Sequence, residues 1–132
     1  SDPSRKDILL YLDGSEASLR MADHVGFILG EEKDHHVDIM ALESIASRSS
    51  LMDQYTKAIM GNGVDTDRIR KLPPVSGNPA GEILEKVEKG PYAAVALGRA
   101  GTEENFFFRL FRGPVCSSLF REMKDAALWL CP

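Results

Sequence analysis

A lone carboxylate, Asp13, directly follows the apolar run 8–12 and precedes Gly14 and Ser15. A short continuous apolar run is typical of a strand covered on both faces, so Asp13 is expected where a buried strand ends and a helix begins. Open parallel sheets bind ligands at these carboxyl ends. Asp13 is therefore a candidate acceptor for a sugar hydroxyl. The alternative is that Asp13 or Ser15 only caps the following helix, which is the commoner role of such residues.

A second candidate site is the glycine-containing loop that follows the apolar run 92–97. Residues 98–101 read Gly-Arg-Ala-Gly, and Gly113 and Pro114 follow after eleven intervening residues. Glycines let backbone amides approach an anion closely, and the start of the next helix adds its positive dipole end. We predict a phosphate site between Gly98, Gly101 and the corner at Gly113. The alternative is that these are ordinary turn glycines.

Alternating strands and helices would position both loops at one edge of a sheet. Four apolar runs predict strands, and a charged run that ends before a Pro pair predicts an edge strand. Periodic apolar residues predict helices between them, with Ser15 as an N-cap and Pro79 at a first helical position. Strands joined by helices run parallel, which gives a doubly wound α/β sheet with helices on both faces. The predicted strands are 8–12, 37–42, 68–72, 92–97 and 126–131, and the predicted helices are 16–29, 50–60, 79–89 and about 114–124.

Composition excludes several classes of protein. The 132 residues fit one domain spanning 1–132. Sixteen basic and twenty acidic residues give a net charge of −4, and no basic run exceeds two residues, so nucleic-acid binding is not expected. No apolar run approaches the roughly 18 residues of a membrane span. Two distant cysteines and a start without an apolar segment favour a cytoplasmic protein. The missing Met and the final Pro132 suggest a domain excised from a longer or tandem protein.

Three ordered motifs make the chain resemble the universal stress protein family. Residues 11–16 (YLDGSE) are similar to the family's V-D-G-S-E strand end. Residues 77–84 (GNPAGEIL) match its G-x-P-A-x-x-I-L segment, and residues 92–101 (YAAVALGRAG) resemble its Y-D-L-I-V-M-G-x-x-G strand and loop. The match extends over nearly the whole chain, and three motifs in the right order are more specific than any one of them.

The resemblance implies a stress-response signalling module with a five-stranded sheet in the order 3-2-1-4-5, like that of the adenine nucleotide alpha hydrolases. It also implies dimerisation, or pairing with a tandem sister domain, through the last strand, here Leu128, Trp129 and Leu130. One subset of the family binds ATP, with Mg²⁺ brought by the phosphates. Carried over to this chain, Asp13 with Gly14 would meet the ribose and Met40 or Ala41 would line the adenine pocket. The phosphates would meet Gly98, Arg99, Gly101, Gly113 and Val115.

The phosphate loop departs from the family pattern. The family's loop has nine residues and then G-S or G-T, whereas this chain has eleven and then Gly113-Pro114. Pro114 supplies neither a hydroxyl nor a backbone N–H. The rival hypothesis is therefore a nucleotide-free dimerisation or interaction module, in which Phe106 and Phe108 of the longer loop contact a partner; these phenylalanines could equally pack on the domain or at a dimer interface.

An enzyme is the poorer hypothesis. The chain has no G-x-S-x-G elbow, no Walker A sequence and no metal-ligand spacing among its His and Cys residues. No general base stands near an obvious nucleophile, so no catalytic residue and no metal site is assigned. Slow ATP hydrolysis incidental to signalling is kept as a third hypothesis.

Overall fold

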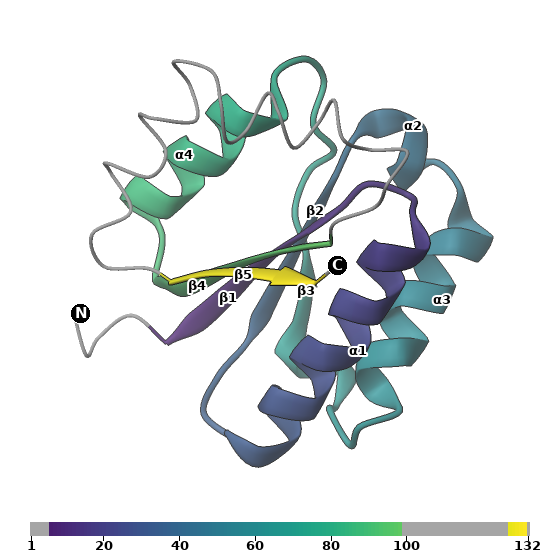
Figure 1. Cartoon of the computed structure of the whole chain (residues 1–132), viewed down its shortest axis with the longest axis vertical. Helices are drawn as coiled ribbons and strands as arrows, with labels where there is room; N and C mark the ends of the chain where they lie inside the picture. Colours follow the sequence, from purple (N-terminus) through teal and green to yellow (C-terminus); the bar gives the residue numbers. More distant parts are fainter. Residues whose placement is uncertain (1–5, 99–126, 132) are drawn as a thin grey trace.

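Short strands alternate with helices along the chain, and the computed structural model describes residues 6–98 and 127–131 (Figure 1). Every strand and helix predicted within these ranges is present, with bounds that differ from the predicted ones by at most two residues. In chain order the elements are β1 (Asp7–Leu12), α1 (Glu16–Glu31), β2 (Val37–Ala41), α2 (Glu43–Ala46), α3 (Ser49–Met60), the 3₁₀ turn η1 (Thr66–Arg68), β3 (Ile69–Lys71), α4 (Pro79–Lys89), β4 (Tyr92–Gly98) and β5 (Ala127–Cys131).

The sheet is parallel and has β1 at its centre. β1 pairs with β2 on one side and with β4 on the other, and β3 extends the sheet beyond β2. These four strands confirm the predicted order 3-2-1-4. β5 lies beside β4 in parallel register, with Ala94 opposite Ala127 and Gly98 opposite Cys131. The carboxyl ends of β1, β2 and β4 therefore meet at one edge, as the prediction of a site there requires.

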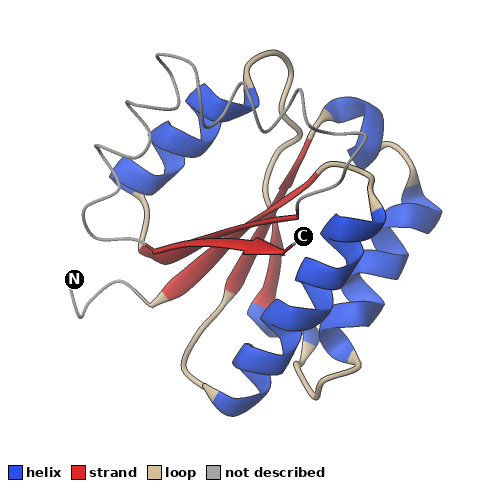
Figure 2. Ribbon diagram, in the orientation of Figure 1, coloured by secondary structure: helices blue, strands red, loops and turns tan. Residues whose placement is uncertain are grey.

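Helices cover both faces of the sheet, with α1 and α3 on one side and α4 on the other (Figures 1 and 2). All six residues of β1 are buried, which explains its unbroken apolar run. Successive side chains of a strand point to opposite faces. Ile8, Leu10 and Leu12 accordingly join the core under α1 and α3, whereas Leu9 and Tyr11 join the core under α4.

The segment between β2 and β3 differs from the prediction in one respect. The Ser-rich sequence of 44–50 predicts a loop, but α2 and the first turn of α3 occupy most of this stretch. Ser44 lies inside α2, and Ser49 and Ser50 begin α3. Ser is tolerated in the first turn of a helix, so the Ser content was a weak signal for a loop. Tertiary packing decides here, because Ile45, Ala46 and Leu51 pack on the core under α1 and α3.

The structure tests two further expectations only within the residues that it describes. The helix predicted at about 114–124 lies outside the described residues. Within the described ranges, no helix has both the length and the apolar character needed to cross a membrane.

Candidate functional site

The turn after β1 holds Asp13 in a closed set of hydrogen bonds at the start of α1. Its Oδ1 atom accepts from the backbone N–H of Ser15 at 2.9 Å, from the Ser15 hydroxyl at 2.5 Å and from the Ser18 hydroxyl at 2.6 Å. Ser15 is the N-cap of α1, and its Oγ accepts from the N–H of Ser18 at 3.1 Å. The capping prediction for Ser15 is thus confirmed. Asp13 supports the cap through one of its two carboxylate oxygens.

The other oxygen of Asp13 is the distinctive feature of this turn. Oδ2 is buried and accepts no hydrogen bond from any residue in the described part of the chain. Buried polar atoms in folded proteins nearly always have a partner, because a lone one loses its hydration without replacement. Helix capping accounts for Oδ1 alone. The carboxylate therefore retains acceptor capacity for a hydroxyl or amine donor that the described residues do not supply.

Tyr55, on α3, closes the turn from the side. Its hydroxyl donates to the carbonyl oxygen of Ser15 at 3.3 Å, and its side chain is fully buried. Burial, followed by the nearby negative charge of Asp13, raises the pKa of Tyr55 to about 12. Tyr55 is consequently neutral at physiological pH, so it places a polar hydroxyl beside the turn without adding a negative charge.

Gly14 is required by the backbone of the same turn. Its φ is +89°, a conformation that residues with a Cβ rarely adopt. A Cβ at this position would also lie 2.8 Å from Cδ1 of Ile45, on α2. The turn that carries Asp13 is thus packed directly against α2.

The strand register brings the predicted site residues of three strands together. Leu12 pairs with Ala41, and Tyr11 pairs with Leu97, so that Gly98 follows immediately beside the end of β1. Asp13 therefore lies between the ends of β2 and β4. The strand ends place Asp13, Gly14, Ala41 and Gly98 at one edge of the sheet.

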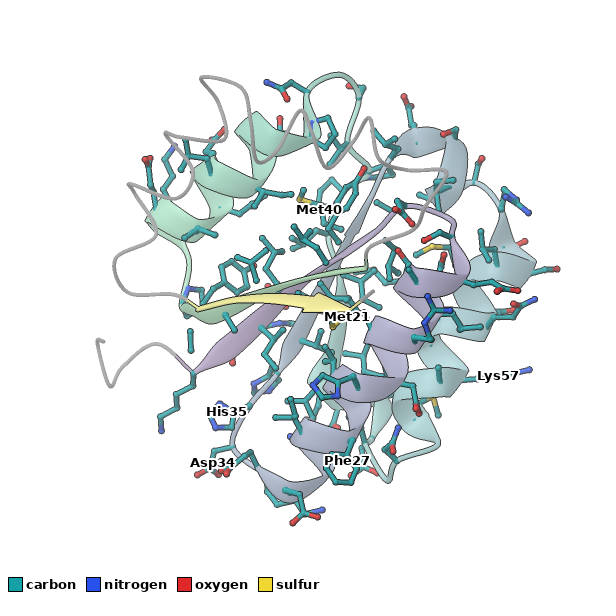
Figure 3. The ribbon with its side chains drawn as sticks, in the orientation of Figure 1. Met21, Phe27, Asp34, His35, Met40 and Lys57 are labelled. Atoms are coloured by element: carbon teal, nitrogen blue, oxygen red, sulfur yellow. The ribbon has the colours of Figure 1, made fainter. Side chains whose placement is uncertain are left out.

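Met40 and Ala41, the two residues predicted to line an adenine pocket, face opposite sides of the sheet. Met40 is 1% exposed and lies in the core under α4 (Figure 3). Ala41 belongs to the core under α1 and α3 and lines a pocket of about 280 Å³. This pocket lies between β2, the segment after β3, and helices α2 and α3. Its lining residues are Ile39, Ala41, Ala46, Ser49, Met52, Asp53, Lys71, Leu72 and Pro74.

The remaining predicted residues fall into two groups. Arg99, Phe106, Phe108 and the loop positions from Gly101 to Val115 lie outside the described residues. Leu128, Trp129 and Leu130 lie on β5, which pairs with β4 away from β1. Within the described ranges, no group of three His, Cys, Asp or Glu side chains is placed to hold a metal ion.

Ser18 and Tyr55 were not predicted as part of the site. Ser18 had a usable signal, since it follows Ser15 by three residues and so lies one turn into the helix that begins beside Asp13. Tyr55 carried no such signal. Within the helix predicted at 50–60 it counts only as one of the periodic apolar residues, and only the packing of α3 against α1 brings its hydroxyl to the turn.

Comparison with known proteins identifies the class of fold. No protein-family model matches the chain, and a search of curated proteins found no match. Solved structures do match over nearly the full length. A universal stress protein in complex with cAMP has a TM-score of 0.69 and 22% identity, covering 95% of each chain.

Two further structures point to the same class. A protein of the universal stress protein family from Burkholderia pseudomallei has a TM-score of 0.63 and 13% identity, covering 100% of this chain and 99% of its own. A universal stress protein from Archaeoglobus fulgidus has a TM-score of 0.68 and 12% identity, covering 96% and 93%. The chain therefore has the universal stress protein fold, and the resemblance seen in the sequence is confirmed at that level.

Proposed function

We propose that this protein is a regulatory module of the universal stress protein type that binds an adenine nucleotide at the carboxyl edge of its sheet. The observation that carries the proposal is the buried Oδ2 atom of Asp13, which has no donor among the described residues. A ribose hydroxyl is a donor of the right kind. Leaving a buried acceptor unpaired costs about 1–3 kcal/mol, so a ligand hydroxyl that pairs with it is favoured by a similar amount.

The neighbouring strand ends support a nucleotide rather than a simple sugar. The pocket beside Ala41 is mostly apolar and would accept a base, with Asp53 and Lys71 among its polar lining residues. Gly98 ends β4 next to β1, and in our proposal the loop that begins there holds the phosphates through Arg99, Gly101, Gly113 and Val115. Mg²⁺, if present, arrives on those phosphates. The cAMP complex of a protein with the same fold supports an adenine nucleotide as the ligand class.

Binding should be tested first on the unaltered protein. We expect denaturation of purified protein to release an adenine nucleotide detectable by mass spectrometry, and calorimetry to give micromolar affinity for at least one of AMP, ATP and cAMP. Protein that carries no nucleotide and gives no heat with any of the three would refute the proposal.

Two substitutions then locate the site. Asp13→Asn should weaken binding by roughly 10- to 100-fold, the value of a hydrogen bond to a charged group. Gly113→Leu should abolish it if the phosphates lie where we propose. The matched control is Asp34→Ala, because Asp34 is exposed and lies beyond the far end of α1, before β2 (Figure 3). Unchanged affinity in Asp13→Asn would place the ligand elsewhere.

A second candidate function is dimerisation, and the position of β5 favours it. Among the strands that the structure describes, β5 is the outermost on its side of the sheet, and its sequence includes the apolar run 128–130. An edge strand with apolar side chains readily pairs with another strand or sheet. We propose that two copies, or this domain and a sister domain, associate there. Sedimentation velocity at high micromolar concentration should show a dimer that Trp129→Lys disrupts; a monomer throughout would refute self-association.

A further inference from the structure

We infer that Ser18 is a positioning residue for Asp13, and that through Asp13 it makes the site select nucleotides that carry a free ribose hydroxyl. The inference rests on the proposed function and adds to it a residue and a selectivity. Three steps support it: the bonds of Ser18, the saturation of one carboxylate oxygen, and the burial of the other.

The hydroxyl of Ser18 is bonded in both directions. It donates to Oδ1 of Asp13 at 2.6 Å and accepts from the backbone N–H of Asp13 at 3.0 Å. Ser18 is 0% exposed, so no water competes for either bond. One serine thus holds both the backbone and the side chain of Asp13, from one turn into α1.

These bonds saturate Oδ1 and leave Oδ2 for a ligand. A carboxylate oxygen offers about two lone-pair directions, and Oδ1 already receives three donors from Ser15 and Ser18. A partial rotation of the carboxylate would break all three bonds, and a half turn only exchanges its two equivalent oxygens. Asp13 is therefore fixed in one orientation, with Oδ2 as its available acceptor.

The burial of Oδ2 in this fixed orientation makes the site discriminate between ribonucleotides and deoxynucleotides. Oδ2 is buried and has no donor among the described residues, so a ligand that offers a hydroxyl there gains a hydrogen bond that its deoxy analogue cannot make. Sites built to bond a hydroxyl reject analogues that lack it much more strongly than apolar sites reject a missing methylene. A deoxynucleotide that lacks the paired hydroxyl should therefore bind more weakly than the ribonucleotide.

The alternative is that Ser18 merely stabilises the start of α1, and ligand selectivity separates the two roles. We would measure by calorimetry the affinities of AMP, 2′-deoxy-AMP and 3′-deoxy-AMP for the unaltered protein, Ser18→Ala, Asp13→Asn and the double variant. We expect one of the two deoxynucleotides to bind the unaltered protein roughly tenfold more weakly than AMP. Ser18→Ala should reduce that preference at least threefold, and it should have no further effect on AMP affinity in the Asp13→Asn background.

Two further variants control for a folding defect. Ser18→Cys replaces the hydroxyl by a somewhat larger thiol that donates only weakly, so this variant should lose preference for AMP nearly as Ser18→Ala does. Ser50→Ala, at an exposed serine of α3, should leave both affinity and preference unchanged. Circular dichroism confirms folding in each case.

The outcomes that overturn the inference differ from those that overturn the proposed function. An equal loss of affinity for AMP and both deoxynucleotides in Ser18→Ala would assign Ser18 a structural role only. An unchanged preference would show that Asp13 is held without it. Absence of any binding to the unaltered protein would overturn the proposed function, and this inference with it.

Discussion

The guanidinium of Arg70 joins the buried carboxylate of Asp38, with Nε donating to Oδ1 at 2.5 Å. The same group donates through Nη2 to Asp7 at 2.7 Å, so a residue of the edge strand β3 reaches across β2 to β1. Tyr92, on β4, completes the set by donating to Oδ2 of Asp38 at 2.5 Å. The hydrogen bond to Asp38 raises the pKa of Arg70, and burial followed by Asp38 raises the pKa of Tyr92. Ion pairs and hydrogen bonds thus connect the strands at the amino-terminal end of the sheet, opposite the candidate site.

Arg70→Ala should destabilise the protein by about 3 kcal/mol in urea unfolding. The substitution leaves Asp7 and Asp38 buried without their cation, and breaking such a pair is costly. The value is placed at the lower end of the range for buried pairs because Arg70 itself is 48% exposed. Arg70→Lys keeps the charge but cannot bond both carboxylates as a fork, so we expect an intermediate loss.

The matched control for Arg70 is Lys71→Ala, at the next position of the same strand. Lys71 is exposed, so its removal should change stability by less than about 0.5 kcal/mol. Equal losses in Arg70→Ala and Lys71→Ala would mean that the network contributes nothing beyond strand propensity.

Arg68 should be a second stabilising arginine, because from η1 it donates hydrogen bonds to carbonyl oxygens at the C-terminal end of α1. Its guanidinium donates to the carbonyl oxygens of Leu29, Glu32 and His35 at 2.6–2.9 Å, and the last turn of α1 contains no basic residue of its own. Arg68→Met keeps the aliphatic stem and removes the donors, which should cost about 1.5–3 kcal/mol in urea unfolding. A loss below about 0.5 kcal/mol would mean that water replaces the guanidinium at these carbonyls.

Gly14→Ala should impair nucleotide binding more than its effect on stability suggests. Gly14 and Gly63 have nearly the same φ, +89° and +90°, so alanine strains both backbones by about 1–2 kcal/mol. A Cβ at Gly14 also meets Ile45, whereas a Cβ at Gly63 meets nothing within 4 Å. Cδ1 is the flexible end of the Ile45 side chain, so the main effect at Gly14 is backbone strain, and only this change puts that strain in the turn that carries Asp13.

Gly63→Ala is therefore the matched control for that experiment. Both variants should lose similar stability in urea unfolding, but only Gly14→Ala should lose affinity for AMP, by roughly tenfold. If both variants bound AMP equally well, the Gly14 turn would not belong to the ligand site.

The sequence predicted the fold well because the fold depends on local patterns. The unbroken apolar run of β1, the Ser15 cap and the periodic stripe of α3 each act within a few residues. The central strands also have motifs that resemble a known family. Edge β3, the least certain strand, was predicted from its charge, and the structure gives it three residues.

The polar networks could not be predicted in the same way. The sequence shows Arg70 only as part of a charged run that suits an edge strand, and Asp38 only as one residue of an apolar run. Their pairing depends on the register that sets Arg70 opposite Asp38, which no local pattern specifies. A carboxylate inside a buried strand was nevertheless a signal, since such a group needs a partner.

Tyr55 should make stability fall at alkaline pH and should report on the charge of Asp13. Its pKa is raised from 10.0 to about 12, so the native state retains a proton that the unfolded state loses above pH 10. The resulting stability is fully present below pH 10 and is lost as pH rises through about 12. Tyr55→Phe loses the bond to Ser15 and should be less stable at pH 8. The difference in the free energy of unfolding between Tyr55→Phe and the unaltered protein should then shrink as pH approaches 12.

The contribution of Asp13 to that pKa can be measured separately. Asp13→Asn removes a negative charge that disfavours the tyrosinate, so the pKa of Tyr55 should fall, as followed by ultraviolet absorbance with Tyr55→Phe identifying the transition. Burial is the larger cause, so the pKa should stay above 10. Asp34→Ala, which removes a charge beyond the far end of α1, should leave it in place. A pKa of Tyr55 that does not respond to Asp13→Asn would mean that the two side chains are electrostatically independent.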